Sequence, residues 1–167
     1  MPSRPHLEIV RINPGLREAF EAFLREISLS GDERFFHPHP MDSAAAERIC
    51  AYEGEDLYYV AKLGERVVGY GLLRGWDEGY EVPSLGICVG HDVRSEGLGE
   101  LMMRFLHAAA RARGANLVRL KVHPLNLPAR RLYEKLGYRF EGMDAGEDIG
   151  TLSLRQVASE QTRTGNV

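Results

Sequence analysis

Two short stretches of the sequence contain residues whose types and spacing could bind or transform a small molecule. The first runs from Arg94 to Gly99 and joins an apolar segment to a long helical pattern. Glycines let the backbone approach a ligand closely, and the first N–H groups of a helix have no partner inside the helix. Because the helix dipole also favours an anion at that end, the pattern is typical of a phosphate-binding loop.

The same residues exclude two better-known phosphate sites. A P-loop requires Gly-Lys followed by Ser or Thr, which the stretch lacks. The dinucleotide fingerprint requires a third glycine where this chain has Met102. Alone, the Arg-x-x-Gly-x-Gly spacing fits a plain helix-entry turn more often than a binding loop.

The second stretch runs from Asn126 to Tyr138. Helical spacing places Ala129, Leu132 and Tyr133 near one side of a short helix that Asn126 caps. A tyrosine at such a position is more often a core aromatic than a catalytic residue. Neither stretch therefore defines a function by itself.

The elements that must position these stretches are a mixture of strands and helices. Hydrophobic periodicity predicts strands over residues 6–12, 57–63, 66–74, 82–90, 116–122, 138–143 and 151–157. It predicts helices over residues 16–27, from Asp42 or Ser43 to about 52, over 97–113 and over 127–136. Three consecutive strands argue against a doubly wound Rossmann sheet and favour a mixed α/β sheet with helices on both faces.

Length and composition predict one domain over residues 1–158 and a polar, disordered tail over 159–167. The net charge of −3 argues against a general nucleic-acid-binding protein, which would show a basic face. No apolar run reaches membrane-spanning length and no signal-peptide core is present, so we expect a cytoplasmic protein without a membrane partner. Cys50 and Cys88 are not at metal-ligand spacing, so we expect reduced thiols and no metal.

Taken together, the two stretches resemble the GCN5-related N-acetyltransferase (GNAT) family. The resemblance runs from about Ser84 to Tyr138 and rests on the strand SLGICV, on Arg94-x-x-Gly97-x-Gly99, and on Asn126-x-x-Ala129-x-x-Leu132-Tyr133-x-x-x-Gly137-Tyr138. It implies the GNAT fold, with a mostly antiparallel sheet of six to seven strands and a bulged, splayed strand beside the cofactor. It also implies acetyl-CoA as the co-substrate.

The resemblance assigns the cofactor site residue by residue. Backbone N–H groups of the loop would hold the pyrophosphate of acetyl-CoA, the preceding strand would pair with the pantetheine arm, and Asn126 would contact that arm. The residues implied are Ile87, Cys88, Val89, Arg94, Ser95, Glu96, Gly97, Leu98, Gly99 and Asn126. Family members often have Gly and then Lys or Arg where this chain has Ser95-Glu96. Because the contacts are mainly backbone, we expect the Glu96 carboxylate to face solvent.

Tyr133 matches the general acid of the family, directed at the departing sulfur. A thiol pKa near 8.5 against a tyrosine pKa near 10 makes full proton transfer uphill by about 2 kcal/mol, so Tyr133 is expected to donate a hydrogen bond as charge develops. The attacking amine must be neutral, and Glu81, just before the cofactor strand, is the first candidate base. A surface glutamate at the start of a strand is an equally good interpretation of Glu81.

The acceptor side is less defined. His37 and His39 are two apart, would face the same side in extended backbone, and could bind substrate, although loop histidines satisfied by the protein are commoner. The favoured function is acetyl transfer to a primary amine of a small molecule or protein. A non-catalytic acyl-CoA-binding or regulatory domain and an unrelated nucleotide-binding module remain alternatives, and a homodimer remains open.

Overall fold

The computed structural model describes residues 4–155. Its strands are β1 (Leu7–Arg11), β2 (Leu57–Leu63), β3 (Arg66–Arg74), β4 (Ser84–Val89), β5 (Leu117–Val122), β6 (Arg139–Asp144) and β7 (Glu147–Ser153). Its α-helices are α1 (Arg17–Ser30), α2 (Ser43–Cys50), α3 (Leu98–Ala112) and α4 (Leu127–Lys135). Short 3-10 turns lie at η1 (Pro14–Leu16), η2 (Asp32–Arg34) and η3 (His91–Val93). None of the helices within residues 4–155 is long and apolar enough to cross a membrane.

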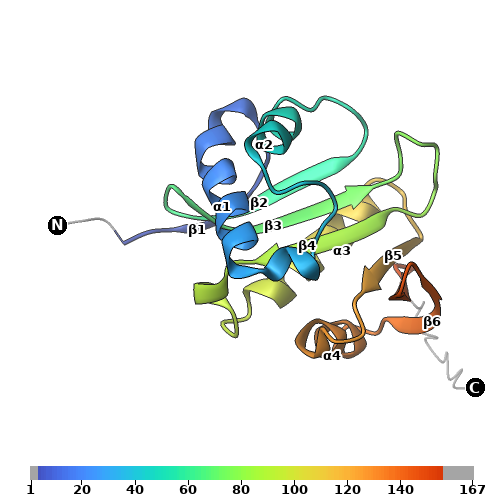
Figure 1. Cartoon of the computed structure of the whole chain (residues 1–167). Coiled ribbons are helices and arrows are strands. Elements are labelled where there is room, and N and C mark those ends of the chain that lie inside the picture. The colour runs from blue at the N-terminus through green and yellow to red at the C-terminus, as the bar shows by residue number, and fades with distance from the viewer. Residues whose placement is uncertain (1–3, 156–167) are drawn as a thin grey trace, which may run out of the picture.

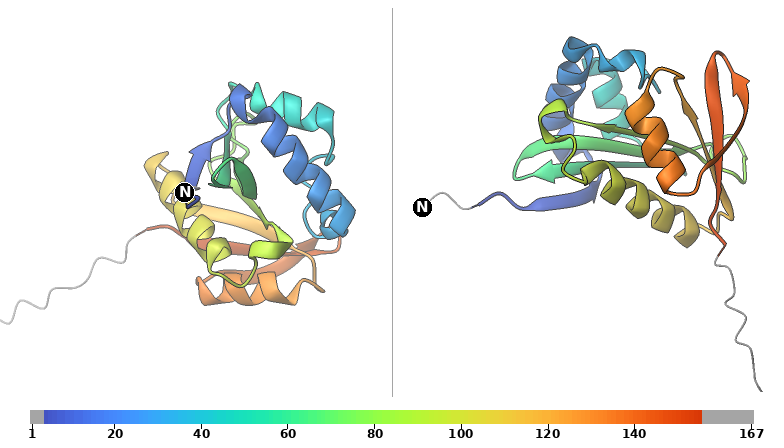
Figure 2. Two further views of the ribbon diagram at one scale, coloured as in Figure 1. Left: turned by 90° about the vertical axis from the view of Figure 1, so that its left-hand side faces the viewer. Right: turned by 90° about the horizontal axis from the view of Figure 1, so that it is seen from below.

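The strands form one seven-stranded sheet in the order β1-β2-β3-β4-β5-β7-β6. Every neighbouring pair is antiparallel except β4 and β5, which are parallel. Helices α1 and α2 cover one face, and α3 and α4 cover the other (Figures 1 and 2). The predicted mixed, mostly antiparallel sheet with helices on both faces is confirmed.

The sheet opens between β4 and β5. Strand β4 pairs with β3 in an unbroken register from Gly69↔Val89 to Arg74↔Ser84. It pairs with β5 at Ser84↔Arg119 alone. The predicted splay is therefore present, and it arises on the β5 side without a register shift between β4 and β3. Beyond Ser84, the edge of β4 that faces β5 has no strand partner among residues 4–155.

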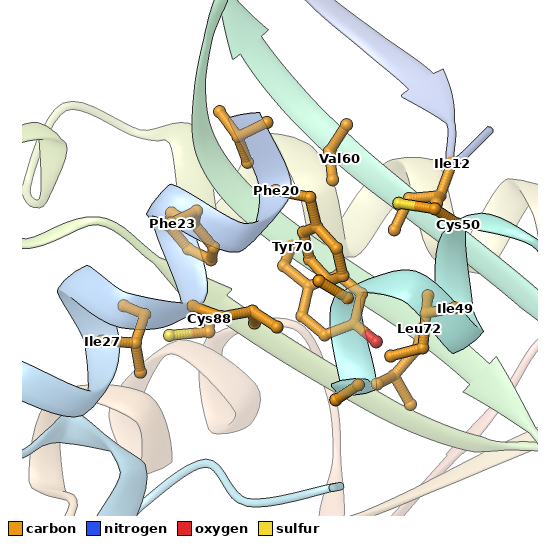
Figure 3. Close-up of a cluster of buried hydrophobic side chains, with 14 residues drawn as sticks. Ile12, Phe20, Phe23, Ile27, Ile49, Cys50, Val60, Tyr70, Leu72 and Cys88 are labelled. Atoms are coloured by element: carbon orange, nitrogen blue, oxygen red, sulfur yellow. The ribbon is translucent and has the colours of Figure 1, made fainter. Parts of the chain in front are cut away.

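Two hydrophobic cores flank the sheet. The first lies beneath α1 and α2, where Phe20 and Phe23 pack around Tyr70 of β3 (Figure 3). The second lies beneath α3 and α4 and includes Leu106 and Tyr133. The two cores hold the helices against opposite faces of the same splayed strands.

Two glycines of β3 let α3 approach the sheet. A Cβ at Gly69 would lie 2.6 Å from Met102 Sδ, and a Cβ at Gly71 would lie 2.9 Å from Leu106 Cδ1. These separations are shorter than a Cβ tolerates, so a side chain at either position would force Met102 or Leu106 to shift. The glycines thereby leave room for the side chains of α3 to pack directly on β3.

The last strand departs from the sequence prediction. It was expected over residues 151–157 but begins at Glu147 and ends at Ser153, and the remainder of the expected range lies outside the described residues. Ala145 (φ 51°) and Gly146 (φ 81°) form a tight two-residue turn between β6 and β7. Such a turn requires positive φ at both positions, which Ala rarely adopts, so the sequence gives little signal for the hairpin. The predicted tail at 159–167 also lies outside the described residues.

Candidate active site

The loop that enters α3 leaves the N-terminus of the helix uncapped. Ser95 (φ 65°) and Gly97 (φ 83°) are left-handed and turn the chain from η3 into α3. Gly97 is the N-cap residue, and no side chain in the described part of the chain accepts a hydrogen bond from the first turn of the helix. The free N–H groups at Leu98 and Gly99 and the dipole of a 15-residue helix together make a site for an anion.

The surroundings of this loop leave room for a ligand. A Cβ at Gly97 would meet no atom within 4 Å. Gly99 lies where α3, α4 and β4 meet, because a Cβ at this position would lie 3.5 Å from Leu132 of α4 and 3.9 Å from Val89 of β4. Glu96 is exposed, and none of the ion pairs within residues 4–155 involves it. The anion site therefore opens directly beside the unpaired edge of β4.

Arg94 ties this loop to the segment after α1. Its Nη2 lies 2.7 Å from Asp32 Oδ2, and its Nε and Nη2 each donate to the Val89 carbonyl at 3.2 Å. Although partial burial of Asp32 opposes it, hydrogen bonds from Ser30 and Arg94 hold the pKa of Asp32 below its ordinary value. Asp32 was not anticipated from the sequence, because it stands 62 positions from its partner.

Tyr133 of α4 is buried, and none of the hydrogen bonds within residues 4–155 involves its hydroxyl. The residue is 7% exposed, and its ring lies 5.7 Å from that of Tyr138. Burial, with a smaller contribution from nearby Cys88, raises the pKa of Tyr133 well above its ordinary value, so the phenol keeps its proton at neutral pH.

Asn126 leaves a donor free at the N-terminus of α4. Its Oδ1 accepts a hydrogen bond from the Ala129 N–H at 3.4 Å, as expected for a helix cap. Its side-chain amide nitrogen donates to nothing within residues 4–155, although the residue is half-buried. A carboxamide held by its oxygen in this way can donate to a ligand beside the helix.

Strand β4 presents backbone rather than side-chain chemistry to the splay. Ile87 and Val89 are half-buried and face the α3 side, whereas Cys88 is 7% exposed and faces α1. Burial raises the pKa of Cys88 to about 12, so its thiol stays neutral. No group of three or more His, Cys, Asp or Glu side chains in the described range is placed to hold a metal ion.

Glu81 is exposed and precedes the first residue of β4, Ser84, at the end where β4 and β5 still pair. None of the hydrogen bonds and ion pairs within residues 4–155 involves its side chain. A base for the amine must lie within hydrogen-bond reach of the acceptor nitrogen, directly or through one water, so the role of Glu81 stays a prediction.

The two loop histidines differ in what they can offer. His39 Nδ1 lies 2.7 Å from the Pro40 carbonyl, which can only accept, so Nε2 is the acceptor for the Tyr70 hydroxyl at 3.0 Å. Burial lowers the pKa of His39, which keeps the ring neutral, and both nitrogens are satisfied. His37 is exposed, donates from Nδ1 to the Glu33 carbonyl at 3.1 Å, and keeps Nε2 free. His37 therefore keeps one ring nitrogen free among the described residues and His39 does not, and substrate binding by either histidine stays a prediction.

The segment over residues 31–41 runs from the end of α1 towards α2, on the face of the sheet that these two helices cover (Figure 1). Phe36 packs edge-on against Tyr70 of β3 and would contact a Cβ at Gly86 of β4 at 3.3 Å. Phe35 lies 5.3 Å, ring to ring, from His123 at the end of β5. The segment also encloses an open hollow of about 670 Å³, lined by Gly31, Glu33, Arg34, His37, His39, Pro40 and Met41. It thus covers the α1 side of the splay, opposite the anion site.

Behind Tyr133, a buried polar pair fixes its neighbour Tyr138. His107 of α3 is 6% exposed, and its Nε2 lies 2.8 Å from the Tyr138 hydroxyl. Burial, and then the nearby Arg111 and Arg104, lower the pKa of His107 to about 4. The neutral ring is therefore favoured in the folded protein.

This pair predicts a loss of stability in mild acid. The unfolded chain takes up a proton at His107 near pH 6.5, whereas the folded protein does so near pH 4, so stability falls as pH is lowered through this window. Between pH 7 and pH 5 the loss is expected to be about 2 kcal/mol. Urea unfolding at both pH values measures it, and His107→Gln should reduce the pH dependence by that amount. The exposed His6→Gln control should leave the dependence unchanged.

The open splay between β4 and β5 and the uncapped N-terminus of α3 beside it are the two main features of the site, and comparison with known proteins identifies the family. The model of the acetyltransferase (GNAT) family matches residues 20–138. The chain therefore belongs to the acetyltransferase (GNAT) family. Streptothricin acetyltransferase of Streptomyces lavendulae is 33% identical over 78 residues, which cover 47% of this chain and 40% of that protein.

Solved structures share the fold at low sequence identity. The GNAT domain of S. lividans PAT has a TM-score of 0.76 and 17% identity, over 88% of this chain and 90% of that one. An acetyltransferase of the GNAT family from Streptococcus pneumoniae has a TM-score of 0.73 and 22% identity, over 89% of this chain and 99% of that one. The PaiA N-acetyltransferase of Thermoplasma acidophilum, solved in complex with coenzyme A, has a TM-score of 0.70 and 15% identity, over 89% of this chain and 99% of that one.

Proposed function

We propose that this chain is an acetyl-CoA-dependent N-acetyltransferase that acts on a primary amine of a small molecule or protein. The observation that carries the proposal is the uncapped N-terminus of α3 at the end of the splayed β4, where Leu132, the neighbour of Tyr133 on α4, also lies. Acetyl-CoA would supply the acetyl group as an activated thioester. Family membership and the coenzyme A bound to a structural neighbour support this donor.

The residues of the site fit this donor. Free N–H groups from Gly97 to Gly99 would bind the pyrophosphate, and the unpaired edge of β4 would pair with the pantetheine amides. The free amide nitrogen of Asn126 would donate to the same arm. A donor that lies along β4 in this way brings its sulfur towards Tyr133, on the α4 side of the splay.

The reaction then needs one proton donor and one oxyanion donor from the protein. As the amine nitrogen bonds to the carbonyl carbon, a β4 N–H near Val89 would stabilise the tetrahedral oxyanion. The C–S bond then breaks, and Tyr133 donates its hydrogen bond to the sulfur as negative charge develops there. The proton lost by the amine passes to water.

A panel of amines assayed for thiol release from acetyl-CoA tests the proposal. We expect release with at least one amine, and streptothricin belongs in the panel because of the relative's name. We also expect acetyl-CoA at 100 times its Kd to stabilise the protein by about 2.7 kcal/mol in thermal unfolding. Stabilisation without turnover of any amine would favour the non-catalytic binding domain. Stabilisation by ATP or NAD in place of acetyl-CoA would favour the nucleotide-binding module.

A further inference from the structure

One face of β5 carries a polar row that the donor site does not use. Val118, Leu120 and Val122 are buried in the core beneath α3 and α4. Because side chains alternate along a strand, Arg119 and Lys121 project from the opposite face, and His123 continues their row. Phe35 of the 31–41 segment packs on His123, so this row borders the α1 side of the splay. On the proposed function, that is the side from which the acceptor amine approaches.

Arg119 differs from its neighbours in the row because it lacks a partner. Lys121 Nζ lies 2.6 Å from Asp144 Oδ2, and His123 Nδ1 accepts from the Leu125 N–H at 3.1 Å. Arg119 Nε is buried without a hydrogen bond, and within residues 4–155 no carboxylate lies in ion-pair distance of its guanidinium. A buried, unpaired donor on a charged group is unfavourable, and native proteins seldom retain one without a use.

The position of Arg119 sets its distance from the reaction. It pairs with Ser84 at the base of the splay, whereas α4 meets β4 at Val89: Leu132, the neighbour of Tyr133, and Val89 both lie within 4 Å of a Cβ at Gly99. At a rise of about 3.3 Å per residue, Ser84 and Val89 are roughly 16 Å apart along the strand. The arginine side chain shortens this separation but does not close it. A group bound by Arg119 is therefore several bonds from the nitrogen that is acetylated.

We propose that Arg119 binds a carboxylate of the acceptor, which places an amine several carbons away at the thioester. A guanidinium and a carboxylate match in geometry and form two parallel hydrogen bonds. The inference rests on the proposed function, and it narrows the class of acceptor from any primary amine to ω-amino acids and related compounds. It names a specificity-determining residue on a strand where the family resemblance assigns none.

The test compares matched acceptors that differ only in the anion. For the wild type, kcat/KM for 6-aminohexanoate should exceed that for 6-aminohexanamide by about 10–100-fold, the range for a hydrogen bond to a charged group. Arg119→Gln should lower turnover of the acid by the same factor, leave turnover of the amide unchanged, and leave the KM for acetyl-CoA unchanged. Arg119→Lys, which keeps the charge but loses the paired donors, should give an intermediate preference. Arg11→Gln, on the far edge of the sheet, is the matched control.

Several outcomes would overturn this assignment. Equal turnover of acid and amide by the wild type is one, and an equal loss for both acceptors in Arg119→Gln is another. If no amine is turned over, calorimetric titration of both compounds into the protein with coenzyme A still decides the question. Acid-specific binding lost in Arg119→Gln would then support the anion site while the proposed function fails. Binding without such a preference would remove the site as well.

Discussion

Replacing Tyr133 with Phe is expected to lower kcat by about 100-fold or more, because general acid catalysis contributes about 10²–10⁴-fold. The change removes only the hydroxyl, which has no protein partner within the described residues, so the fold should lose little stability. The KM for acetyl-CoA should stay within a few-fold, since the proposed donor contacts are backbone groups and Asn126. Steady-state kinetics with a saturating amine, together with thermal unfolding, measures all three quantities.

Tyr138→Phe is the matched control for this prediction. Tyr138 is equally buried, lies 5.7 Å from Tyr133, and hydrogen-bonds to His107. Removing its hydroxyl should lower stability by about 1 kcal/mol and change kcat by less than about threefold. An unchanged kcat in Tyr133→Phe, or equal losses of kcat in both variants, would show that Tyr133 is a core aromatic and not the acid.

Because the pKa of Tyr133 is raised, ionisation of this residue should not reduce the rate between pH 7 and pH 10.

The features that could be predicted from the sequence depend on contiguous residues. The strands β2 and β3 have the predicted bounds, because alternation is clear in both and Gly64 marks the turn between them. The N-terminus of α3 and the Asn126 cap also follow from local chemistry, namely glycines and a capping side chain. For the same reason, the residues proposed to bind acetyl-CoA could be predicted from the sequence more completely than those proposed to bind the acceptor amine.

The features that could not be predicted depend on contacts between distant segments. Arg94 meets Asp32 across 62 positions, and Phe35 meets His123 over the splay. His39 turns inward because Tyr70, 31 residues later, offers a hydroxyl that local sequence cannot reveal. Spacing alone placed His37 and His39 on one side, but it carries no information about which side chain the core will satisfy. Because α1, α2 and the strands assemble these contacts together, the acceptor side emerges only from tertiary packing.

The loop between β3 and β4 is held to the protein by two aspartates, Asp77 and Asp56. The Asp77 carboxylate accepts hydrogen bonds from the Tyr52 hydroxyl and, at 2.9 Å, from the Glu55 N–H. Its neighbour in this network is Asp56, which is 5% exposed. Asp56 Oδ1 accepts from the N–H groups of Gly75 and Trp76 at 2.9 Å each and from Asp77 at 3.4 Å.

Replacing Asp56 with Ala is therefore expected to lower the free energy of unfolding by about 3 kcal/mol, because a hydrogen bond to a charged group contributes about 1.5–3 kcal/mol and the partners are left unsatisfied. Asp56→Asn retains an acceptor oxygen without the charge and should lose roughly half as much. Asp77→Asn, which acts at the exposed end of the network, is the control and should lose less than either. Urea unfolding at pH 7 measures the three values. A loss below about 1 kcal/mol for Asp56→Ala would contradict this prediction and would mean that water replaces the carboxylate. The loop between β3 and β4 would then be held mainly by Trp76, whose ring centroid lies 4.9 Å from the guanidinium carbon of Arg113.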